Sequence, residues 1–297
     1  MTFRSKISGF IDTYFEVFSI SLTLAVLFSV VFIPAVYVIY SSFFKKILSY
    51  GQTEEFFIGL SNYFRLFSDP YFWKFLSQNL IYTMGSLVVS FFLAFACALA
   101  LNKITSFKGF FRGIIILPWV FPPVVAALLW RWLFNDSYGL INALLRPVTS
   151  PVLWLGNVKI AMFSVIITDA WTRIPFMMIF LLAGLQTIPN DLYEAAEMDG
   201  ANIFTCFRYI TLPLLKSTIV LLLLITSIFI FRTYVIIGGL TKGGPAQATE
   251  TLTTYIFRLT MEYWDIGYGS ALSTFVLIFI LALGFLYLRI FYKGEGF

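Results

Sequence analysis

The chain has 297 residues, of which 60% are hydrophobic and only 12% are charged. A soluble domain usually draws about a quarter of its residues from the charged set, so this composition excludes an ordinary soluble protein and indicates a surface largely covered by lipid. The formal net charge of +5 is modest, and no basic stripe interleaves with aromatic residues in a polar context, which argues against a nucleic-acid-binding protein.

The residue types that the chain lacks exclude several kinds of chemistry. With no histidine, a Ser-His-Asp triad, a histidine metal site and a histidine proton relay are excluded. Cys97 and Cys206 have no cysteine nearby in sequence, so we expect neither a disulfide nor a thiolate metal site. No Gly-x4-Gly-Lys-Ser/Thr phosphate loop and no Gly-x-Ser-x-Gly motif is present. We therefore expect no catalytic residue, no metal site and no cofactor in this chain.

Six apolar segments are each long enough to cross the hydrocarbon core, which needs about 20 residues of helix. They cover residues 18–43, 77–101, 111–134, 159–186, 214–240 and 269–292. The pattern predicts an all-α fold, a polytopic membrane bundle of six transmembrane helices forming one domain over residues 1–297. The N-terminal run is longer than a signal-peptide core and follows Asp12 and Glu16, so we interpret it as a retained helix at about 18–43, ahead of core helices over about 77–292.

An even number of crossings places both termini on the same side of the membrane. The turn at 102–112 contains Lys103, Lys108 and Arg112 and no acidic residue. Cytoplasmic loops are enriched in lysine and arginine, which favours a cytoplasmic position for this turn. Because the turn follows the second crossing, it lies on the same side as the termini, and both termini are then expected inside the cell.

Glycine and proline mark the expected interruptions. In the 44–76 connection, Gly51, Gly59 and Asp69-Pro70 indicate turns, and the third segment contains Pro118, Pro122 and Pro123. The prolines indicate either a kink that gates a pathway or a static kink satisfied by neighbouring helices. We expect Gly238-Gly239 and Gly243-Gly244-Pro245 to break the end of the fifth segment.

Three charged residues lie deep inside apolar segments, away from the segment ends. Asp169 and Arg173 are four residues apart, which places them on one helix face, where a mutual pair would reduce the cost of about 2.5–3.5 kcal/mol for each charge at mid-membrane. The pair is either part of a polar cavity wall or a structural ion pair between helices. Arg232 has no acidic residue within four positions, so it pairs with another helix, with another subunit or with a solute.

The stretch at 187–213 has a helix–turn–helix pattern. Pro189 suits a first helical turn, acidic residues follow early in the helix, Gly200 is a natural stop, and Asn202 can cap a second short helix. Thr211 and Pro213 can start the next membrane helix. An amphipathic helix resting on lipid is one interpretation, but such helices are usually basic, whereas this one is acidic. A protein partner is the other interpretation.

The same stretch resembles a known family. Glu194-Ala195-Ala196, Asp199-Gly200-Ala201 and Ile210-Thr211-Leu212-Pro213 look like the EAA loop of permease subunits of bacterial ABC importers. Further motifs along the chain look like the sugar branch of that family, the maltose-permease-like type. They are Gly59-Leu60-Ser61-Asn62-Tyr63, Leu117-Pro118-Trp119, Trp130-Arg131-Trp132, Tyr138-Gly139-Leu140-Ile141-Asn142, Trp171 with Pro175-Phe176, and Gly243-Gly244-Pro245.

The resemblance implies a transmembrane permease subunit in the bacterial inner membrane that imports a sugar-like solute by alternating access. It implies that the 187–213 loop is cytoplasmic and docks on one of two ATP-binding subunits, which hold ATP and magnesium. Carried onto this chain, Glu194 would contact basic groups of the ATPase, Ala195 and Ala196 would allow close packing, and Gly200 would provide the turn. The motif is completed by Asp199, Ala201 and Pro213. The remaining partners implied are a second homologous permease and a solute-binding protein.

The solute is less well indicated. Asp169, Arg173, Arg232 and Tyr234 are candidates for the solute path or for pairing between helices. Where the resembled family would have Phe-Asp before Gly-Gly-Pro, this chain has Tyr234-Val235, so disaccharides, oligosaccharides and polyol derivatives all remain open. A self-sufficient channel or ion-coupled transporter is the main alternative, but it would have no need of a loop that docks on an ATPase. An intramembrane enzyme is the third hypothesis, and the lack of histidine and of a Gly-x-Ser-x-Gly motif argues against it.

Overall fold

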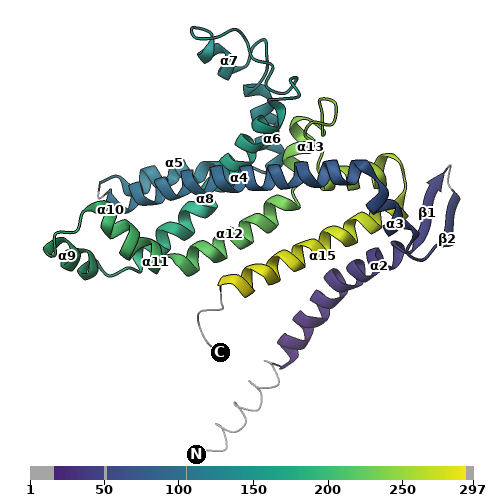
Figure 1. Ribbon diagram of the computed structural model, residues 1–297, viewed down its shortest axis with the longest axis horizontal. Coiled ribbons are helices and arrows are strands. Elements are labelled where there is room, and N and C mark those ends of the chain that lie inside the picture. Colours follow the sequence, from purple (N-terminus) through teal and green to yellow (C-terminus); the bar gives the residue numbers. More distant parts are fainter. Residues whose placement is uncertain (1–16, 50–51, 105, 292–297) are drawn as a thin grey trace, which may run out of the picture. The chain divides into compact units, whose positions relative to one another are not determined.

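The computed structural model describes residues 17–49, 52–104 and 106–291 (Figure 1). Asp12, Glu16 and Gly51 lie outside these ranges, as do both termini. Four described helices are long and apolar enough to cross a membrane, and the number rises to six if each of two bent helix pairs is one span. The described residues are mainly helical, as expected, with one two-stranded sheet in addition.

The chain divides into two compact units. The first contains residues up to Ser68 together with Arg258–Phe275. The second contains Asp69–Phe257 and the residues from Val276 onward, and it includes most of the helices.

The first unit begins with the helical span Val17–Ser41, which includes the π-helix η1 (Phe28–Phe32) and α2 (Ile33–Ser41). It continues with the strands β1 (Phe44–Ser49) and β2 (Gln52–Phe57), with α3 (Ser61–Ser68), with the π-helix η3 (Arg258–Glu262) and with the start of α15 (Ile266–Phe291).

The antiparallel hairpin β1-β2 occupies part of the 44–76 stretch that the sequence indicated only as a connection. Its register pairs Phe44 with Phe57, whose ring centroids are 5.4 Å apart, and Lys46 with Glu55, whose charged groups are 3.1 Å apart. The buried Asn62 of α3 donates to the carbonyl oxygens of Ser42 and Phe44 at 2.8 and 2.9 Å. Opposite charges and paired aromatic rings stabilise the strand pairing.

The second unit contains the remaining helices. They are α4 (Pro70–Lys103), α5 (Lys108–Val120), α6 (Pro123–Leu133), α7 (Leu140–Leu145), α8 (Ala161–Gln186), α9 (Asn190–Met198), α10 (Ile203–Cys206), the π-helix η2 (Phe207–Thr211), α11 (Leu212–Leu214), α12 (Lys216–Phe231), α13 (Val235–Leu240) and α14 (Leu252–Phe257).

Helix α4 starts earlier than the apolar run predicted. The side chain of Asp69 accepts a hydrogen bond from the Tyr71 backbone amide at 2.9 Å, and Pro70 occupies the first turn, which together fix the helix start. At 34 residues the helix is about 51 Å long, so it extends well beyond the hydrocarbon core of about 30 Å.

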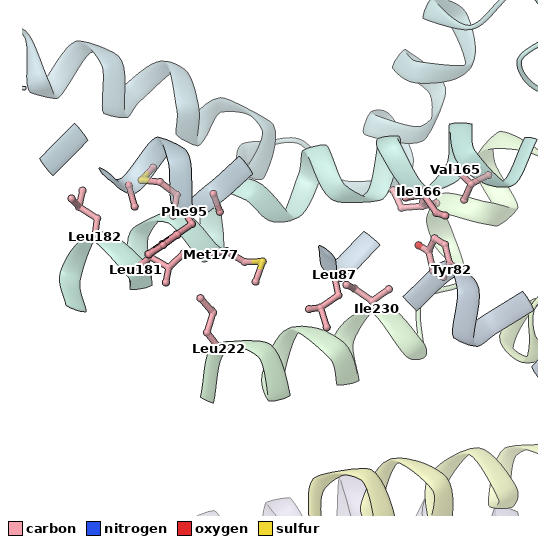
Figure 2. Close-up of a cluster of buried hydrophobic side chains, with 14 of the residues drawn as sticks. Tyr82, Leu87, Phe95, Val165, Ile166, Met177, Leu181, Leu182, Leu222 and Ile230 are labelled. Atoms are coloured by element: carbon pink, nitrogen blue, oxygen red, sulfur yellow. The ribbon is translucent and has the colours of Figure 1, made fainter. Parts of the chain in front are cut away.

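Small residues let α4 approach α8 closely. Ser86, Ser90, Ala94 and Ala98 recur every fourth residue on the buried face of α4, a spacing that permits close helix packing in membranes. A Cβ atom added at Gly85 would lie 2.7 Å from Cδ1 of Ile166 in α8. Figure 2 shows the apolar contacts beside this interface, where Phe95 of α4 lies near Met177, Leu181 and Leu182 of α8, and Leu87 of α4 lies near Ile230 of α12.

Two of the expected spans are interrupted. The third is divided into α5 and α6, which meet at 98° across Phe121 and Pro122, so the prolines do interrupt it. The fifth was predicted as one segment over 214–240, but α12 ends at Phe231 and α13 begins at Val235. The prediction that Gly238-Gly239 break this span is wrong, because both glycines lie within α13.

The helix that leads into α12 also begins earlier than predicted. Helical structure runs from Ile203 to Leu214 and then bends by 65° at Leu215 before α12, rather than starting at Thr211 and Pro213. Leu215 is buried, and a Cβ atom added at Gly184 of α8 would lie 2.8 Å from its side chain. Close packing against α8 therefore holds the bend.

Candidate functional site

The sharp turn between α9 and α10 is formed by residues 199–202, and we call α9, this turn and α10 the elbow. Gly200 has φ of +81°, a region in which glycine is favoured over residues with a side chain. The amide of Ala201 donates to the Ala196 carbonyl at 2.9 Å, and that of Gly200 donates to the Glu197 carbonyl at 3.0 Å. These two bonds form a Schellman motif, which satisfies the last carbonyls of α9.

The second half of the elbow is capped as the sequence predicted. The Asn202 side-chain oxygen accepts a hydrogen bond from the Thr205 amide at 2.9 Å, which fixes the start of α10. With one helix ended by Gly200 and the next begun by Asn202, the angle between them is set by local hydrogen bonds.

The elbow is anchored on one side and exposed on the other. The Tyr193 hydroxyl lies 2.9 Å from the Thr211 hydroxyl, and Ile188 just before α9 is buried. On the opposite side the structure exposes most of the motif residues, Glu194, Ala195, Asp199 and Gly200, and leaves Ala196 and Ala201 half-buried, while Pro213 lies exposed in α11. The structure thus brings Glu194 to Ala201 together on one surface, with Pro213 on a separate helix.

The pairing of Asp169 with Arg173 is confirmed. Nε and Nη2 of Arg173 lie 3.3 and 3.2 Å from Oδ1 of Asp169, whose side chain is fully buried. Nη2 of Arg173 also donates to the Thr233 hydroxyl at 2.8 Å. The ion pair therefore joins the middle of α8 to the break between α12 and α13.

A cavity of about 460 Å³ opens beside this ion pair. The break between α5 and α6 and the break between α12 and α13 both contribute to it, and α8 forms the wall between them. The described lining residues are Pro118, Trp119, Phe121, Pro123, Thr172, Arg173, Phe229, Arg232, Thr233, Tyr234, Val235 and Ile236. A second cavity of about 320 Å³ shares Trp119, Thr172, Arg173 and Phe229 with it. We refer to the larger of these two as the cavity.

Arg232 and Tyr234 both line the cavity, as Arg173 does, whereas Asp169 lies behind its wall. The Arg232 guanidinium lies 5.2 Å from the ring centroid of Phe229. Tyr234 stacks on Phe257 with 4.4 Å between ring centroids.

Apart from Tyr234, sequence reasoning did not propose the aromatic and hydroxyl residues of the wall as solute contacts. Trp119, Phe121, Thr172, Phe229 and Thr233 all line the cavity. One signal could have found two of them. Thr233 is a polar residue in an apolar segment, and such residues generally face the protein interior. Phe229 lies four residues earlier, at the spacing of one helix face.

Comparison with known proteins agrees with this architecture. Residues 86–293 match the family model described as the binding-protein-dependent transport system inner membrane component. The chain is 39% identical over 238 residues to the trehalose/maltose transport system permease protein MalF of Thermococcus litoralis, a match that covers 80% of each chain. It is 36% identical over 268 residues to the sulfoquinovosyl glycerol transport system permease protein SmoG of Agrobacterium fabrum, covering 90% of this chain and 87% of the relative.

The fold has a solved counterpart. A chain from the crystal structure of a bacterial ABC transporter involved in the import of the acidic polysaccharide alginate superposes with a TM-score of 0.84 at 22% identity, covering 98% of this chain and 100% of the other. The family match alone covers more than half of the sequence. The chain therefore belongs to the family of inner membrane components of binding-protein-dependent transport systems.

Proposed function

We propose that this chain is one of two permease subunits in an ATP-driven importer for a sugar-like solute, and that its elbow couples the permease to an ATP-hydrolysing subunit. The observation that carries the proposal is the elbow itself, a rigidly capped turn that exposes acidic and small residues. An acidic helix is poorly suited to an anionic lipid surface, which supports a protein partner.

The side chains of α9 have distinct parts in this coupling. The Glu194 carboxylate is exposed and available to basic groups of the ATPase. Ala195 and Ala196 are small and permit close approach, and Gly200 and Asn202 hold the angle of the elbow. ATP and magnesium are bound by the partner subunits, and this chain supplies no catalytic group.

The position of the elbow sets the orientation. Figure 1 shows α9 and α10 at one end of α4 and α8, away from α6 and α13. With the elbow in the cytoplasm and six crossings, both termini are cytoplasmic, and the whole chain of 1–297 acts as a single permease domain in the inner membrane. A solute-binding protein would deliver the solute to the opposite side, and a second, homologous permease would complete the pathway.

The cavity supplies the place where solute crosses this subunit. Its volume of about 460 Å³ lies within the range of about 300–1,000 Å³ that small-molecule sites occupy. Its wall combines aromatic rings with a few hydrogen-bonding groups, which suits a carbohydrate. The relatives are named for trehalose and maltose in one case and for sulfoquinovosyl glycerol in the other, so their names do not fix the solute.

A charge reversal on the elbow tests the coupling. Glu194→Lys should reduce the recovery of the ATPase subunit with the tagged chain and should reduce ATP-dependent uptake, because a cation would face the partner's basic groups. Asp136→Lys is the matched control, since it makes the same charge change at an exposed carboxylate far from the elbow in sequence. If both variants retain the ATPase and transport equally well, Glu194 has no part in docking.

A further inference from the structure

We propose that the cavity accepts an anionic carbohydrate, one that bears a phosphate, sulfonate or carboxylate group, and that Arg232 binds this group directly. The inference rests on the proposed importer function and narrows its solute class.

The charge balance of the cavity is the first argument. Among the described residues that line it, Arg173 and Arg232 are cationic and none is acidic. The charge of Arg173 is balanced by the buried carboxylate of Asp169, which does not line the cavity and lies 3.2 Å from the guanidinium. Arg232 takes part in no ion pair within the part of the chain that the structure describes. One positive charge therefore faces the cavity without a counter-charge.

The placement of Arg232 is the second argument. It is the C-cap residue of α12, at the break in the fifth span, its side chain is exposed, and it lines the cavity. Charged residues within membrane spans are costly, face a bundle interior or a water-filled cavity, and mark solute pathways. The Arg232 guanidinium lies over the Phe229 ring. This cation–π contact holds the cation against the wall through the face of the guanidinium, and it leaves the N–H donors at the edge of the group available.

The chemistry of the surroundings is the third argument. A guanidinium presents a planar set of N–H donors that fits carboxylate, sulfonate and phosphate oxygens in pairs. Beside it, Trp119 is 57% exposed and Phe229 is 39% exposed, so aromatic surface is available next to the guanidinium for the apolar side of a sugar ring. The Thr172 hydroxyl donates to the Asp169 carbonyl at 2.7 Å, which leaves its oxygen to accept from a solute hydroxyl.

Four probes that share a glucose ring and differ at carbon 6 test the proposal. They are glucose, glucuronate, glucose 6-phosphate and sulfoquinovose. Equilibrium binding of each is measured on the intact complex in lipid nanodiscs, with wild-type chain, Arg232→Gln and Arg232→Lys. Arg146→Gln is the matched control, because this arginine is exposed and lies outside the cavity.

We expect at least one anionic probe to bind about tenfold or more tightly than glucose, since a hydrogen-bonded charge pair is worth that much. Arg232→Gln should weaken that anion about ten- to a hundredfold and leave glucose unchanged, and Arg232→Lys should retain part of the affinity. The carboxylate, phosphate and sulfonate arms show which anion the site prefers.

Three results would overturn the proposal. They are glucose binding as tightly as every anion, no binding of any anion, and an anion affinity that Arg232→Gln leaves unchanged. If Arg232→Gln instead releases a second permease subunit from the complex without altering anion affinity, Arg232 pairs between subunits. The proposed function is tested separately by Glu194→Lys, as above, and the cavity as the solute site is tested by Trp119→Ala, which should weaken every probe. If it weakens none, the cavity is not the solute site at all.

Discussion

The conformation of Gly200 gives a sharp test of the elbow. Its φ of +81° is favourable for glycine and strongly unfavourable for a β-branched residue. A Cβ atom added there would meet no other atom within 4 Å, so a substitution changes the backbone preference without creating a clash. Gly200→Val therefore isolates the effect of conformational strain.

The expected magnitude follows from that strain. A residue forced into a sparsely populated backbone region costs on the order of 1–3 kcal/mol, and a cost of about 2 kcal/mol lowers the equilibrium constant between the native elbow and its alternatives by about thirtyfold. The chain should still insert, because the strain is local. Solute-stimulated ATP hydrolysis by the reconstituted complex should fall, by at most that factor, since Glu194 and Ala195 would be misplaced relative to the ATPase.

Graded substitutions provide the controls. Gly200→Asn should retain most of the stimulated activity, because asparagine tolerates positive φ better than other residues with side chains, and Gly200→Ala should fall in between. Gly284→Val is the matched control within a membrane helix, as a Cβ atom there also meets nothing within 4 Å and φ lies outside the positive range. If Val and Asn at position 200 give equal activity, the elbow's angle does not control coupling, and the proposal loses its main physical support.

Two further predictions concern topology and the buried ion pair. Single cysteines introduced near Tyr138 and Gln247 should react with an impermeant thiol reagent added outside intact cells, whereas one near Asn190 should not, and labelling at Asn190 would overturn the orientation. Asp169→Asn should lower stability by about 2–4 kcal/mol in thermal unfolding of the purified complex, because it leaves the guanidinium of Arg173 in a largely buried site without its counter-charge. Replacing Arg173 by methionine in the same variant should restore part of that loss, and an Asp169→Asn variant as stable as wild type would show that the pair is not structural.

The elbow could be predicted from the sequence because its determinants are local. A helix stop at Gly200 and a cap at Asn202 act through hydrogen bonds that span five residues or fewer. The pairing of Asp169 with Arg173 could be predicted for the same reason, since a separation of four residues places two side chains on one helix face. Local signals of this kind do not depend on how the rest of the chain folds.

The break in the fifth span could not be located from local signals. Glycines suggested positions 238 and 239, but a Cβ atom at Gly239 would lie 2.6 Å from that of Ala127 in α6. Gly239 therefore serves the close packing of α13 against α6. The true break, beside Thr233, is held by contacts from distant parts of the chain, since Arg173 donates to its hydroxyl and Thr253 donates to its carbonyl.

The hairpin β1-β2 was missed for a related reason. Neither strand shows a clean alternation of polar and apolar residues, which is the local signal for a strand. What pairs them is complementarity across the hairpin, with Lys46 opposite Glu55 and Phe44 opposite Phe57. Such a signal appears only after two segments are aligned in the correct register.

The interruptions in the two spans are explained by the position of the cavity. Within a bilayer, backbone that leaves the helical hydrogen-bond pattern is tolerated only where it is buried in protein or lines a water-filled space. Phe121 at the first break and residues 232–234 at the second all line the cavity, so both interruptions occur beside it. From the second break, α12, the buried bend at Leu215 and the helical run back to Ile203 form a short connection to the elbow. A displacement of the elbow by a partner would therefore act on α12, whose C-cap is Arg232, which is the physical basis for expecting coupling between the elbow and the cavity.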